Sequence, residues 1–139
     1  MTPGDKSSLG QAQTSKYLLD VNAILAAVWV NHPDHQKTDS WLQGKQIVTC
    51  PLSELGFLRV STNPKALKSD MRTARQLLEA FLEKQKAEFV AADLPALKAN
   101  ARKSHEVTDL YLAELAASKG LKLATLDTAI SHAAAEVVA

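Results

Sequence analysis

The sequence contains one cysteine, few aromatic residues and no long apolar run, and each scarcity removes a class of protein. Cys50 has no second cysteine to pair with, so no disulfide forms within the chain, which agrees with a reducing compartment. No apolar run approaches the roughly 20 residues that span a bilayer. The first residues are polar and show no secretory signal, so we expect a cytoplasmic protein with no membrane partner. Neither glycine-rich phosphate-binding motif occurs, which disfavours the common nucleotide-binding folds.

The composition that remains is that of an ordinary globular domain. The 139 residues are 46% hydrophobic and 22% charged, which suits one domain with a core large enough to fold alone. Residues 1–16 show no hydrophobic period, so we predict a flexible N-terminal extension there and a single domain over residues 17–139. The formal net charge of +1 does not by itself indicate nucleic-acid binding.

Short apolar segments alternate with helical patterns along the predicted domain. The segments that predict strands are residues 17–21, 47–50, 88–91, 121–125 and 136–138. The segments that predict helices are residues 22–30, 33–42, 51–62, 69–85, 95–102, 107–119 and 128–134. Strands that alternate with helices predict an α/β fold with a central, mostly parallel sheet of four to five short strands flanked by helices.

Four acidic residues fall at equivalent places in this pattern, each beside the end of a strand or the start of a helix. They are Asp20 at the end of the first strand, Glu54 and Asp109 in the first turns of two helices, and Asp127 directly after the fourth strand. Ligands of parallel α/β sheets collect beyond the carboxyl ends of the strands, so we expect the four carboxylates on one rim.

Converging carboxylates predict a divalent metal site. Carboxylates that lie close together repel one another unless a cation is present, and oxygen-only ligands suit Mg²⁺ or Mn²⁺. One or two such ions activate water and stabilise a phosphodiester under attack, so the pattern predicts a nuclease. Setting these four acids aside leaves 16 basic and 11 acidic residues, and this mildly basic remainder suits a polyanionic substrate.

Simpler explanations exist for the acids taken one at a time. Carboxylates at helix N-termini complement the helix dipole, which would account for Glu54 and Asp109. Asp127 could be an N-cap residue of the helix expected after it. An unpaired acid at the end of a buried strand is costly, so for Asp20 the ligand role is favoured.

Four local strings resemble the motifs of the PIN-domain family, in the family's order, and in particular those of VapC-type toxins. The strings are YLLDVN at 17–22, SELGFLRV at 53–60 followed by TNP at 62–64, VTDLYLA at 107–113, and LATLD at 123–127. Each string is a weak signal alone, but together they cover nearly the whole chain from Tyr17 onward. The resemblance implies a three-layer PIN-like fold and a metal-dependent endoribonuclease that is held inactive by a paired antitoxin protein and commonly forms a homodimer.

The resemblance also implies roles for individual residues. Asp20, Glu54 and Asp109 would hold the Mg²⁺ or Mn²⁺ ion and Asp127 would complete the site. Supporting polar roles fall to Asn22, Thr108 and Thr125. Glu106 lies close to Asp109 in a polar stretch, residues 103–106, for which the family gives no role to transfer.

Other side chains invite functional roles that simpler explanations rival. Arg59, Arg72 and Arg75 are predicted to guide RNA phosphates toward the acids, although a solvated helix face explains them equally. We expect Trp29 to belong to the core or a dimer interface more readily than to stack on RNA bases. The apolar residues Val28, Trp29, Phe57 and Leu58 are predicted to receive the antitoxin.

Two alternatives to the nuclease remain open. A non-catalytic module of the same fold would bind RNA or protein without cutting, and the presence of all four acids argues against it. A phosphatase or phosphoacceptor domain is disfavoured, because the sequence after Asp20 lacks a second aspartate two residues on.

Overall fold

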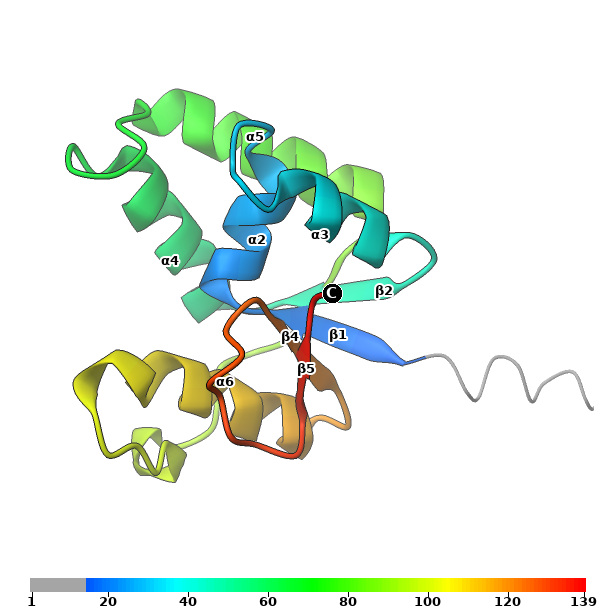
Figure 1. Ribbon diagram of the computed structural model, residues 1–139, viewed down its shortest axis with the longest axis vertical. Helices are drawn as coiled ribbons and strands as arrows, with labels where there is room; N and C mark the ends of the chain where they lie inside the picture. The colour runs from blue at the N-terminus through cyan, green and yellow to red at the C-terminus, as the bar shows by residue number, and fades with distance from the viewer. Residues whose placement is uncertain (1–14) are drawn as a thin grey trace, which may run out of the picture.

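The computed structural model describes residues 15–139, which form a parallel sheet with helices on both faces (Figure 1). The strands are β1 (Lys16–Leu19), β2 (Gln46–Thr49), β3 (Glu88–Phe89), β4 (Lys122–Thr125) and β5 (Ala135–Val137). Their order across the sheet is β3-β2-β1-β4-β5, and every neighbouring pair is parallel. The predicted α/β class and parallel sheet are therefore confirmed, and β1 lies in the centre of the sheet.

The helices divide into two layers. On one face lie α2 (Val21–Val28), α3 (His35–Leu42), α4 (Pro51–Thr62) and α5 (Met71–Gln85). On the other face lies α6 (Val107–Ser118), preceded by the short 3-10 turns η1 (Ala96–Lys98) and η2 (Ser104–Glu106). Among residues 15–139, none of the helices combines the length and the apolar character needed to cross a lipid bilayer.

Successive side chains along each strand point to opposite faces of the sheet, and this produces two hydrophobic cores, one on each face. In β1, Tyr17 and Leu19 pack against α2, α3, α4 and α5, whereas Leu18 packs against α6. Val48 of β2 and Leu123 of β4 join Leu18 on the α6 side. These strand residues are almost fully buried, which explains why the strands appear in the sequence as continuous apolar segments rather than alternating ones.

Most predicted elements are present with ends shifted by one or two residues, and two predictions were wrong. Residues 128–134 do not form a helix, because Asp127 Oδ1 accepts a hydrogen bond from the backbone N–H of Ala129 at 2.8 Å and turns the chain at once. Residues 95–102 contain only the single 3-10 turn η1. Gly120 does follow α6 in the left-handed region, with φ +71°.

The predicted N-terminal extension, residues 1–16, lies outside the described residues except for its last two. Of these, Lys16 is the first residue of β1 and pairs with Gln46 of β2. The described part of the chain therefore begins one residue before the central strand of the sheet.

Candidate active site

Asp20 lies where the central strand β1 passes into α2, and its carboxylate is almost completely buried, with 1% exposure. Its Oδ1 accepts a hydrogen bond from the backbone N–H of Ala23 at 2.7 Å, so the side chain caps α2. Its backbone N–H donates to the carbonyl oxygen of Ala124 at 3.1 Å and joins the ends of β1 and β4. These hydrogen bonds fix the Asp20 carboxyl group in a buried position at the carboxyl-terminal edge of the sheet.

Burial raises the pKa of Asp20 to about 6, because a charged carboxylate is poorly solvated there. Hydrogen bonds from Thr125 and from the Ala23 backbone lower the pKa, and the negative charges of Asp109 and Asp127 raise it. No ion pair among residues 15–139 includes Asp20. The site therefore buries a carboxylate without a cationic partner from the described chain.

Thr125 and Asp127 bring the end of β4 to this carboxylate. Thr125 is fully buried, and its hydroxyl oxygen accepts a hydrogen bond from the backbone N–H of Asp127 at 3.0 Å. The same hydroxyl favours the ionised form of Asp20. Thr125 therefore interacts through its hydroxyl with both Asp20 and Asp127, which are two of the predicted site residues.

Asp109 approaches from the opposite layer, in the first turn of α6. Desolvation and the negative charge of Asp127 raise the pKa of Asp109, while the nearby His105 lowers it. Asp109 also raises the pKa of Asp20. Three of the four predicted acids are therefore close enough to repel one another, although they come from three separate elements.

Glu54 occupies a different position on the same rim. Its Oε2 accepts a hydrogen bond from the Thr49 hydroxyl at 2.7 Å, at the end of β2. The neighbouring Ser53 donates to the carbonyl oxygen of Leu19 at 2.6 Å, so the first turn of α4 is anchored directly before Asp20. Glu54 is thus held at the end of β2, the strand that pairs with β1, which leads to Asp20.

A glycine allows α4 to approach α2 beside the site. A Cβ atom at Gly56 would clash with the side chain of Val21, the residue after Asp20. Because β1 continues directly into α2, this close approach keeps the helix that carries Glu54 against the start of α2.

The three converging acids suit a hard divalent cation by their chemistry. Within residues 15–139, no group of three His, Cys, Asp or Glu side chains is already arranged to hold a metal ion. The acids converge without forming a closed coordination shell. Their oxygens are nevertheless the ligand type that Mg²⁺ and Mn²⁺ prefer, and a buried acid at Asp20 with two negative neighbours would be stabilised by such a cation.

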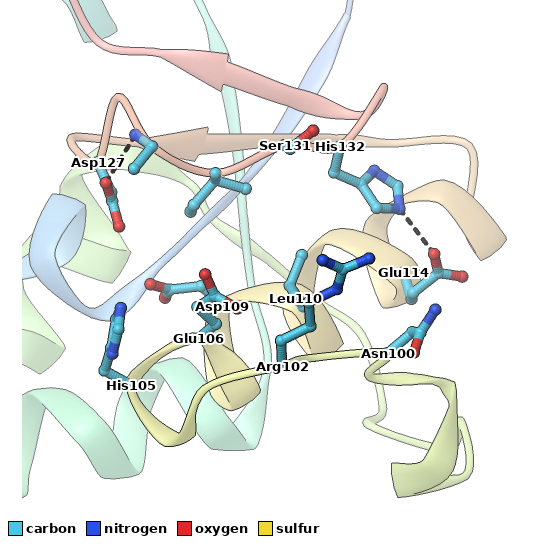
Figure 2. A pocket seen from close by; sticks show the side chains of 12 residues that line it. Asn100, Arg102, His105, Glu106, Asp109, Leu110, Glu114, Asp127, Ser131 and His132 are labelled. Carbon is cyan, nitrogen blue, oxygen red and sulfur yellow. Dashed lines mark hydrogen bonds and ion pairs between the residues drawn. The ribbon is translucent and has the colours of Figure 1, made fainter.

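A cavity of about 520 Å³ opens beside these acids (Figure 2). Asp109 and Glu106 point into it from the start of α6, and Asp127 faces them from the chain between β4 and β5. At the other end lie the hydrogen-bonded pair of Glu114 and His132, together with Asn100 and Arg102. Asn100, Arg102 and Glu114 were not among the predicted site residues, because none of them belongs to the four motif strings or follows a predicted strand.

The remaining predicted residues lie on the surface or in the core. Asn22 and Thr108 are exposed in the first turns of α2 and α6, with no side-chain hydrogen bond among the described residues. The predicted RNA-binding side chains are all exposed on two helices that pack together: Arg59 on α4, and Arg72 and Arg75 on α5.

The apolar residues predicted to receive an antitoxin lie in or against the core, and the prediction was wrong for Phe57. Val28, Trp29 and Leu58 are only partly buried. Phe57 is fully buried and stacks on Trp29, with 6.4 Å between ring centroids. Trp29 also donates to the Ser61 hydroxyl at 2.9 Å. This contact confirms the structural role expected for Trp29.

Comparison with known proteins shows which protein family the chain belongs to. The PIN domain family model matches residues 17–136, and the chain belongs to this family. It is similar to Ribonuclease VapC38 of Mycobacterium tuberculosis, with 36% identity over 81% of this chain and 86% of that protein. It is also similar to Ribonuclease VapC39 of the same organism, with 30% identity over 84% of this chain and 92% of that protein. The resemblance stated from the four sequence motifs is therefore confirmed.

A solved structure supports the fold independently. A chain in the crystal structure of VapBC2 from Rickettsia felis bound to a DNA fragment from their promoter superposes with a TM-score of 0.59. The match covers 88% of this chain and 98% of that chain at 16% sequence identity, so it bears on the fold alone. The three-layer PIN-like fold is thus confirmed.

Proposed function

We propose that this protein is a divalent-metal-dependent endoribonuclease that hydrolyses phosphodiester bonds of RNA. The observation that carries the proposal is Asp20, an acid buried at 1% exposure, without a cationic partner in residues 15–139, and faced by two further acids. Such an arrangement costs folding free energy and is retained where a cation is to be bound. The relatives named as ribonucleases support the substrate class.

In this proposal the four acids hold Mg²⁺ or Mn²⁺ at the carboxyl ends of β1, β2 and β4. When bound, the metal supplies Lewis acidity toward the phosphodiester and lowers the pKa of a water molecule. The chain supplies the position of each carboxylate: the α2 cap fixes Asp20, Thr125 fixes Asp127, and Thr49 restrains Glu54. Asp109 and Asp127 line the open cavity and would face the substrate directly.

We also propose that the protein is the toxin of a toxin–antitoxin pair and acts in the cytoplasm. Its relatives carry the name Ribonuclease VapC, and its structural neighbour belongs to a VapBC complex. A cognate antitoxin would inhibit most directly by placing an arginine against the acids of the rim, because an arginine binds carboxylates through paired hydrogen bonds. We further expect a homodimer, which light scattering would reveal as twice the mass of the chain.

The decisive experiment is cleavage of cellular RNA by purified protein. We expect cleavage with Mg²⁺ or Mn²⁺, loss of cleavage on addition of EDTA, and recovery when the metal is restored. Asp20→Asn, which keeps the cap acceptor and removes the charge, is expected to abolish cleavage while the fold is retained. RNA binding without cleavage under every metal condition would favour the non-catalytic module instead.

A further inference from the structure

The cavity continues well beyond the acids that the proposed function uses. Its volume of about 520 Å³ lies within the range of small-molecule sites. One end is bounded by Asp109 and Asp127, and the other by Asn100 and Arg102 (Figure 2). The space therefore connects the metal-binding acids with a separate group of side chains that no metal role explains.

The polar groups at the far end divide into paired and unpaired ones. His132 is fully engaged, because its Nδ1 accepts from the backbone N–H of Ala134 at 2.9 Å and its Nε2 donates to Glu114 at 2.7 Å. That pair closes the end of the cavity and holds the β4–β5 connection against α6. Arg102 and Asn100 have no side-chain hydrogen bond or ion pair among residues 15–139, so their donors are free for a ligand.

The rest of the lining includes apolar side chains and one cationic side chain. Leu110 of α6 and Ile130 of the β4–β5 connection contribute apolar surface from two different segments. Arg102 is the only lysine or arginine among the lining residues, and it can bind phosphate through paired hydrogen bonds. The amide of Asn100 can both donate to and accept from the edge of a base.

We propose that this cavity binds the nucleotide adjacent to the scissile phosphodiester. The base lies against Leu110 and Ile130, Asn100 reads its edge, and Arg102 binds the neighbouring phosphate. This inference rests on the proposed ribonuclease function and assigns to that function its first specificity-determining residues outside the acid cluster.

Two neighbouring cations allow a matched test. Both side chains are exposed, but Arg102 lines the cavity and the next residue, Lys103, does not. Arg102→Gln and Lys103→Gln remove the same charge from the same segment, and both are made in the full chain carrying Asp20→Asn, so that RNA is not consumed. The probe is a short, end-labelled, single-stranded RNA of random sequence, and binding is measured by fluorescence anisotropy in buffer containing Mg²⁺.

Arg102→Gln should weaken RNA binding about tenfold, the effect of losing one charge-assisted hydrogen-bonded contact. It should also reduce the slope of log affinity against log salt by about 0.7, the share of one phosphate contact on single-stranded RNA. Lys103→Gln should bind like the parent. In the otherwise wild-type enzyme, Arg102→Gln should raise KM with little change in kcat, and Asn100→Ala should flatten the base preference at one position beside the cut.

The outcomes separate this inference from the proposed function. If the wild-type protein cleaves RNA and Arg102→Gln behaves like Lys103→Gln, the subsite is wrong and the ribonuclease stands. If nothing is cleaved but binding still depends on Arg102, the cavity binds RNA, but the nuclease is wrong and with it the place of the subsite beside a scissile bond. Unchanged RNA binding with impaired antitoxin binding would assign the cavity to the antitoxin and overturn the subsite.

Discussion

Replacing Asp20 by asparagine should stabilise the metal-free protein, although it destroys the proposed activity. Burial raises the pKa of Asp20 from 3.8 to about 6, so the folded state disfavours the ionised carboxylate. A raised acid pKa destabilises the fold above that pKa, and the penalty disappears as the pH falls toward the unfolded value. The shift corresponds to about 3 kcal/mol at pH 8 and about half that at pH 5.

Asparagine retains the oxygen that caps α2, so the substitution removes the charge without removing the hydrogen bond to Ala23. The assay is urea unfolding followed by circular dichroism, with EDTA present, at pH 8 and pH 5. The matched control is Asp39→Asn, which removes an exposed acid from α3 and should change the free energy of unfolding little.

Metal should reverse the order of stability. Mn²⁺ at 1,000 times its dissociation constant adds about 4.1 kcal/mol to a protein that binds it only when folded, which exceeds the penalty of about 3 kcal/mol at pH 8. We expect the wild-type protein to gain this stabilisation and Asp20→Asn to lose most of it. If Asp20→Asn is no more stable than the wild-type protein at pH 8 without metal, the buried Asp20 carboxylate does not destabilise the metal-free fold, and the reasoning from its raised pKa is refuted.

Three further substitutions probe how the site is built. Asp109→Asn should also stabilise the metal-free protein, but by less because Asp109 is only partly buried, and should abolish cleavage; unchanged cleavage would remove it from the site. Thr125→Val removes the acceptor of the Asp127 N–H and should cost about 1–3 kcal/mol of unfolding free energy and lower Mn²⁺ affinity in calorimetric titration. Gly56→Ala should cost about 1–3 kcal/mol, because its Cβ meets the Val21 side chain; a thermal melt unchanged from wild type would contradict the close helix approach.

Much of the fold could be predicted because local signals agree with the tertiary structure. Residues 17–19 of β1 are covered on both faces of the sheet, so this part of the strand is apolar throughout. Helix ends follow local chemistry: Pro51 opens α4, and Gly120 follows α6 with positive φ. Acids placed after strands could be assigned to one rim because the carboxyl ends of parallel strands share an edge.

The features that could not be predicted depend on irregular segments. Residues 128–134 have helix-compatible composition, but the hydrogen bond from Ala129 to the Asp127 side chain forms a turn in place of a helical start. The cavity walls come from residues 100–106, from α6 and from residues 127–132, and these segments lie near one another because α6 packs against β4. No spacing in the sequence reports that contact, so Arg102 carried no signal before the structure.

We propose that Asp20, Asp109 and Asp127 form the core of one divalent cation site, which Glu54 completes. An anomalous difference map from a crystal soaked in Mn²⁺ measures this directly. We expect a peak within coordination distance of the Asp20 oxygen that does not cap α2, shared with Asp109 or Asp127, and absent from crystals of Asp20→Asn. A peak elsewhere, or a peak that persists in Asp20→Asn, would contradict it.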